Sequence, residues 1–184
     1  DFLAPGKELG GKLHASTGDN GTHFIGSGIL ALGNETGDIL LAASERHLGD
    51  YWPGNKGDIG NIRINNDTGN YDRYAESIKN NKIPDTNYRM HSRLAKVGWN
   101  LPANQRLQLS YLQTQTASPI AGTLTNLGTR PPYELGWKRT GYSDVMARNA
   151  AFDYSLAPEG VDWLDFQAKL YYVDTQDDSD TYST

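Results

Sequence analysis

The side chains best suited to bind a transition-metal ion are four histidines, since imidazole is a ligand for most such metals. His14 and His23 flank a short segment at 18–21, where a hairpin would bring both to one face as near-diagonal neighbours. His47 and His91 flank a long connection, so we expect both near its rim. Because ordinary polar positions on a strand with one solvated face explain all four better than a ligand role does, the sequence assigns no metal ligand to this chain.

The nucleophiles and acidic residues form no arrangement typical of an enzyme. The chain has no cysteine, and Ser27, Ser44 and Ser110 lack the G-x-S-x-G context of a nucleophile elbow. Residues 177–180 (DDSD) resemble the start of a calcium loop, but the glycine at the sixth position and the closing glutamate are missing. We expect that segment to be a solvated acidic loop, and the chain not to be an enzyme.

Composition narrows the class of protein. The 184 residues suit one domain, and 17 basic against 22 acidic residues leave a net charge of −5, which disfavours nucleic-acid binding. No run of 18 apolar residues could form a transmembrane helix. With 20 glycines, 11 tyrosines and 37% hydrophobic residues, the chain fits a turn-rich all-β protein or a transmembrane β-barrel, whose strands are only half apolar.

Alternation of apolar and polar residues predicts the strands. Seven are expected, at 9–17, 22–33, 38–47, 93–101, 106–115, 148–156 and 163–172, with a short helix at 71–80. On the last strands, Leu109, Phe152 and Phe166 fall on one face. Gln108, Asp153 and Gln167 fall on the other face.

The connections alternate in length. Tight turns are expected at 34–37, 102–104 and 157–161, and long connections at 48–91 and 117–143. Closing the turns pairs Leu32 with Ile39, Val97 with Leu109, and Phe152 with Phe166, so apolar faces coincide. This layout predicts an antiparallel up-and-down transmembrane β-barrel segment with short periplasmic turns and long extracellular loops. A soluble sandwich uses the same alternation and remains the alternative.

The two long connections are the best candidates for a protein-binding surface. Charges in 50–91 balance, and aromatic side chains with arginine on a neutral field suit protein recognition. The candidate partner-binding residues are Tyr51, Trp52, Arg73, Tyr74, Tyr88, Tyr133 and Trp137.

Several segments together resemble TonB-dependent outer-membrane receptors, in particular their heme- and hemophore-uptake branch. Residues 1–12 (DFLAPGKELGGK) look like the junction between plug and first barrel strand, and 16–21 (STGDNG) like the first hairpin loop. Residues 45–54 (ERHLGDYWPG) resemble the R-x-x-G-D-Y-x-x-G motif that follows the third strand. Further similar segments are the hairpin 96–101 and 105–111 (KVGWNL and QRLQLSY) and the strand 169–175 (KLYYVDT).

The resemblance implies a piece of a larger protein. Residues 1–8 would end the plug or linker, and 9–184 would form about seven strands of a 22-stranded barrel in the Gram-negative outer membrane. The partners implied are heme or a hemophore at the extracellular loops, the plug inside the barrel, the TonB complex through a missing N-terminal part, and lipid. No cofactor is expected within the segment, and heme would be the transported ligand. The open alternatives are a soluble β-domain of a surface adhesin and a small outer-membrane barrel.

Overall fold

The computed structural model describes Leu3, Lys82 and residues 8–52, 85–120, 123–126, 135–138 and 141–181. All regular structure in these ranges is β-strand. The strands are β1 (Leu9–Ser16), β2 (Thr22–Gly33), β3 (Gly37–Leu48), β4 (Tyr88–Leu101), β5 (Gln105–Ile120), β6 (Thr123–Asn126), β7 (Leu135–Lys138), β8 (Gly141–Leu156) and β9 (Phe166–Thr181). The described residues include no helix with the length and hydropathy needed to span a bilayer.

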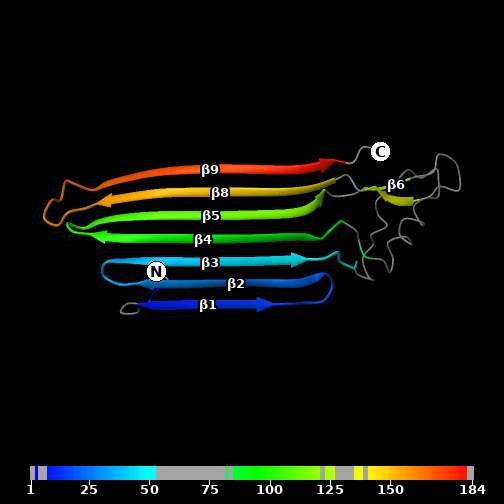
Figure 1. The fold of residues 1–184 in the computed structure, drawn as a ribbon, viewed down its shortest axis with the longest axis horizontal. Helices are drawn as coiled ribbons and strands as arrows, with labels where there is room; N and C mark the ends of the chain where they lie inside the picture. Colours follow the sequence, from blue (N-terminus) through cyan, green and yellow to red (C-terminus); the bar gives the residue numbers. More distant parts are fainter. Residues whose placement is uncertain are drawn as a thin grey trace.

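Seven strands form one antiparallel sheet in the order β1-β2-β3-β4-β5-β8-β9. Each strand pairs with the next along the chain, except that β5 pairs with β8 across the connection that contains β6 and β7. The pair β6-β7 forms a small separate hairpin within the second long connection. Figure 1 shows the three short connections at one end of the sheet; the strand ends that border the long connections, and β6, lie at the other. The predicted up-and-down arrangement of seven strands is confirmed, whereas the hairpin β6-β7 was not predicted.

The first two tight turns have the chemistry expected from their residues. In the β2-β3 turn, the Asn34 Oδ1 accepts hydrogen bonds from the backbone N–H groups of Thr36 (2.9 Å) and Gly37 (3.1 Å). In the β4-β5 turn, Ala103 and Asn104 adopt positive φ angles of 60° and 53°. The pairs Leu32 with Ile39 and Val97 with Leu109 form as predicted.

The register predicted for the third hairpin is wrong. Phe152 pairs with Leu170 rather than Phe166, and Phe166 pairs with Leu156. The connection runs from 157 to 165, because the backbone N–H of Leu164 bonds to the carbonyl of Val161 (3.0 Å) and extends the turn. Since the shift is by an even number of residues, the side chains of β9 keep their predicted faces. Residues 163–165, predicted as the start of this strand, lie in the connection.

The sheet has two chemically different faces. One face, which we call the apolar face, carries a central row of residues paired from strand to strand. This row is Leu9, Leu32, Ile39, Val97, Leu109, Phe152 and Leu170. The opposite face, which we call the polar face, carries the paired row Asp38, Gly98, Gln108, Asp153 and Lys169. The faces predicted for Leu109, Phe152 and Phe166, and for Gln108, Asp153 and Gln167, are therefore confirmed.

The apolar face is uncovered. Ala31 is the one hydrophobic residue buried in the described ranges, whereas Leu109 is 47% and Leu170 is 71% exposed. Aromatic residues flank its central row, with Trp99 and Tyr154 toward the tight turns. Tyr111 and Tyr172 lie toward the long connections. In the described residues, a single sheet with one apolar face and one polar face is the arrangement of a barrel wall.

The strands extend further toward the long connections than alternation indicated. β4 begins at Tyr88, β5 continues to Ile120 and β8 begins at Gly141. Residues 177–180, predicted as a loop, lie in β9. Apolar and polar residues do not alternate regularly in these extensions, as in 141–147 (GYSDVMA), so hydrophobic periodicity could not find them. The helix predicted at 71–80 lies outside the described residues.

Candidate partner-binding site at the long-connection end

The first long connection is closed at its base by Asp50. Its Oδ1 accepts hydrogen bonds from the backbone N–H groups of Thr86 and Asn87, both 3.1 Å, and from the Asn87 Nδ2 at 2.9 Å. The backbone N–H of Tyr51 donates to the Thr86 Oγ1 at 3.3 Å. One carboxylate thus joins the residues that follow β3 to those that precede β4.

The same base is attached to the tip of the β1-β2 connection. The Asn20 Nδ2 donates to the Trp52 carbonyl at 3.1 Å, and the Trp52 N–H donates back to the Asn20 Oδ1. The Gly49 N–H donates to the Gly21 carbonyl at 2.6 Å. Gly21 has a φ of 89°, and a Cβ there would lie 2.7 Å from the Gly49 carbonyl oxygen, so this approach requires glycine.

Hydrogen bonding sets the ionisation of Asp50. Partial burial raises the pKa of this carboxyl, but the hydrogen bonds donated by Asn87 and Thr86 outweigh burial and leave the pKa below its usual value. We call Asp50 and its hydrogen bonds to Thr86 and Asn87 the clamp; its acceptor is therefore an ionised carboxylate at neutral pH.

Two of the predicted partner-binding residues lie at the base of this connection and have exposed side chains. Tyr51 and Trp52 are 45% and 46% exposed, although their backbones are held by the bonds to Thr86 and Asn20. The Lys82 Nζ lies 6.0 Å from the centre of a Trp52 ring, at the limit of a cation–π contact. Aromatic side chains on a fixed backbone bind partners at a low cost in conformational entropy.

Tyr88 lies in β4, beside β3, rather than in a loop. Its hydroxyl accepts a hydrogen bond from the Arg46 Nη1 at 3.2 Å. Within the segment 45–54, three residues join β3 or its end to a neighbouring segment; they are Arg46, Gly49 and Asp50. Sequence reasoning singled out the aromatic residues here and missed Asp50 and Asn20; the R-x-x-G-D-Y spacing was the available signal.

The remaining predicted residues have no described side chain. Arg73, Tyr74 and Tyr133 lie outside the described residues, and Trp137 lies in β7, where the backbone alone is described. The structure thus brings Tyr51, Trp52 and Tyr88 to one end of the sheet.

The histidines are arranged differently from the prediction. His14 pairs with Ser27, so His14 and His23 are not near-diagonal neighbours. His23 lies at an irregularity in the pairing of β2 with β3, and its ring packs edge-on against His47, with centroids 4.9 Å apart. The described residues contain no group of three or more His, Cys, Asp or Glu side chains that could hold a metal ion.

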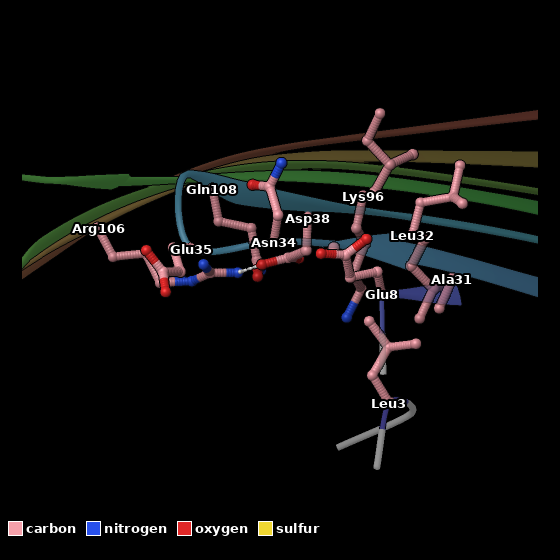
Figure 2. A pocket seen from close by; sticks show the side chains of 13 residues that line it. Leu3, Glu8, Ala31, Leu32, Asn34, Glu35, Asp38, Lys96, Arg106 and Gln108 are labelled. Carbon is pink, nitrogen blue, oxygen red and sulfur yellow. Dashed lines mark hydrogen bonds and ion pairs between the residues drawn. The ribbon is translucent and has the colours of Figure 1, made fainter. Parts of the chain in front are cut away.

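A second polar site lies at the opposite end of the sheet, on the polar face. It is a hollow of about 710 Å³ beside Leu3, lined by both signs of charge (Figure 2). The charged residues that line it are Glu8, Glu35, Asp38, Lys96 and Arg106. The Arg106 Nη2 bonds to the Asp38 Oδ2 at 2.6 Å, and its Nη1 to the Asn100 Oδ1 at 2.7 Å.

The ion pair spans three strands because Gly98 has no side chain. Arg106 is on β5 and Asp38 on β3, so the guanidinium crosses β4 directly over Gly98. A Cβ at Gly98 would collide with the guanidinium group. A side chain at this position would displace the guanidinium from its place over β4.

Comparisons with known proteins point to one class of receptor. No family model matches the chain. The structure of a double mutant of the Serratia marcescens hemophore receptor HasR, in complex with its hemophore HasA and heme, is similar with a TM-score of 0.72 and 77% identity. The match covers 98% of this chain and 22% of that chain. The hemophilin receptor of Acinetobacter baumannii is 28% identical over 182 residues, which cover 94% of this chain and 17% of that receptor. The chain thus spans about a fifth of each protein.

Proposed function

We propose, from the premise that this chain is a segment of a HasR-like receptor barrel, that it helps a TonB-dependent receptor to capture a heme-carrying hemophore at the outer membrane. Residues 1–8 would end the plug or linker, and 9–184 would belong to the barrel. The long connections would face the extracellular medium and the tight turns the periplasm. Heme would be cargo of the whole receptor, and TonB would supply energy through parts outside this chain.

The observation that carries the proposal is the fixed base at the long-connection end. Asp50 and Asn20 hold the backbone that presents Tyr51 and Trp52 to solvent. A protein carrier needs such exposed aromatic anchors, whereas a small ligand would need an enclosed pocket. The polar hollow beside Leu3 would contact the plug, because it lies on the face that would line the lumen.

Substitution of Trp52 tests the proposal. In the intact receptor, Trp52→Ala should weaken hemophore binding by about tenfold or more, mostly through faster dissociation, as measured by surface plasmon resonance. Trp163→Ala is the matched control, because Trp163 is 83% exposed in the β8-β9 connection at the opposite end. Equal affinities of the two variants would refute the assignment of this surface.

Deletion of residues 55–85 separates capture from transport. Uptake of free heme at saturating concentration should survive, while hemophore affinity falls. Unchanged hemophore affinity in the deletion variant would make this connection purely structural.

A further inference from the structure

A hollow of about 470 Å³ lies midway along the first four strands, on the polar face. Its lining comes mainly from two neighbouring cross-strand rows. The first row is Lys12, Ile29, Ala42 and Leu94, and the second is His14, Ser27, Ser44 and Ser92. Because alternate residues of a strand share a face, all eight side chains lie on the side that would line the lumen.

The middle of this hollow is low and largely apolar. Ala42 and Ser44 have short side chains, so they leave room above β3. Ile29 and Leu94 lie on the two sides of Ala42 and add apolar surface. The Ser92 Oγ lies 3.2 Å from the Thr114 Oγ1, so this hydroxyl has a partner on the neighbouring strand and need not be solvated. The hollow therefore offers an apolar floor to a ligand.

His14 and Lys12 border the hollow on the β1 side. They are two residues apart, about 7 Å along the strand, and both side chains are exposed. The described part of the chain gives neither of them a hydrogen-bonding or ionic partner. Neither cross-strand row contains a carboxylate on any of the seven strands. An imidazole and an ammonium group are thus available to a ligand in the hollow.

We propose that this hollow is a second heme site, at which imported heme rests on its way through the lumen. Heme combines an apolar macrocycle, an iron that accepts imidazole, and two propionate carboxylates. The floor of the hollow would contact the macrocycle, His14 would ligate the iron, and Lys12 would pair with a propionate.

The position of the hollow agrees with a site on a transport path. It lies between the long-connection end and the tight turns, on the face that would line the lumen. Lys96 occupies the next row toward the tight turns and lines the hollow beside Leu3, so a further cation follows in that direction. The inference rests on the proposed function, because heme reaches this wall only if the receptor imports it.

The test titrates the intact receptor in detergent with heme and follows the Soret absorption. The wild-type receptor should bind a second equivalent of heme, more weakly than the first. His14→Ala should weaken the second step at least tenfold and leave the first unchanged. His91→Ala is the matched control, because His91 pairs with Glu45 on the apolar face, and it should change neither step.

Two further comparisons separate ligation from packing. His14→Met supplies another ligand for heme iron and should keep the second equivalent with an altered spectrum, whereas His14→Leu should lose it. Lys12→Met should weaken the second step for heme but not for heme dimethyl ester, because the ester has no carboxylate to pair with Lys12.

Three results would overturn the site. They are the absence of a second equivalent in the wild-type receptor, which would leave the hollow to the plug, an unchanged second step in His14→Ala, and equal effects of Lys12→Met on heme and its ester. Hemophore affinity is measured on the same samples. If hemophore binds while the second heme step fails, this inference is rejected and the proposed function stands; if the wild-type receptor binds no hemophore, the proposed function itself is rejected.

Discussion

Asp50 is the residue on which the base of the first long connection depends, because its carboxylate accepts three hydrogen bonds within 3.1 Å from Thr86 and Asn87. In the intact receptor, Asp50→Ala should remove them and make the connection more susceptible to proteolysis. Since the site is only partly buried, we expect a local loss of about 1 kcal/mol. The rate of cleavage within the connection, measured by limited proteolysis at neutral pH, reports this loss. Asp19→Asn is the control, because no described interaction involves the Asp19 side chain, and equal cleavage of both variants would contradict the clamp.

The lowered pKa of Asp50 predicts that the stability of this connection depends on pH. Because the folded-state pKa of Asp50 lies below its ordinary value of 3.8, its contribution to stability is fully present above that value. The contribution is lost as the pH falls through the lowered folded-state pKa. Protease susceptibility of the connection should therefore stay constant from pH 7 to about pH 5 and rise below about pH 4. Asp50→Asn should abolish this titration, and an unchanged profile in that variant would assign the transition to another group.

At the scale of the strands, Gly98 is the position where three of them are joined. Gly98→Ala should displace the Arg106 guanidinium from Asp38 and destabilise the receptor by about 1 kcal/mol, since both partners of the ion pair are more than one-third exposed. A double-mutant cycle with Arg106→Ala, measured by thermal unfolding, isolates the effect. Gly98→Ala should cost less when Arg106 is already absent. If the stability losses of Gly98→Ala and Arg106→Ala were strictly additive, the effect of Gly98 would not act through the ion pair.

The strands also mark how far sequence reasoning reaches. Alternation located the apolar segments because each apolar side chain on a half-wet strand has a defined face. It missed the outer parts of β4, β5 and β8, where apolar and polar residues do not alternate regularly. The third hairpin was misaligned because the bond between Leu164 and Val161 lengthens its turn, and composition carries no signal for that bond. The faces predicted for the side chains of β9 were still correct, because the register error was an even number of residues.

At the scale of the whole molecule, the sheet's orientation toward lipid is the central expectation. Leu109 lies in the central row of the apolar face, and Gln108 is its chain neighbour on the polar face. In the intact barrel, Leu109→Arg should destabilise folding by about 2–4 kcal/mol, whereas Gln108→Arg should be tolerated. Denaturant unfolding in lipid vesicles measures both. Equal effects would contradict the membrane placement.

The candidate site was predictable only in part. Tyr51 and Trp52 stood out because exposed aromatics are typical of protein interfaces. The clamp that holds them joins Asp50 to residues 86–87 and Asn20 to Trp52, over separations of 32 to 37 residues. Such long-range pairs follow from the strand order and from the positive φ at Asn20, which residue types alone do not specify.

The closed base has a consequence for how receptors of this kind diversify. Because Asp50 fixes both ends of the connection next to each other, whatever lies between them adds little to the entropy of closing it. Replacement of the segment between them should therefore leave the pairing of β3 with β4 unchanged. If this connection binds a carrier, as we propose, its specificity could then change without a change in the sheet.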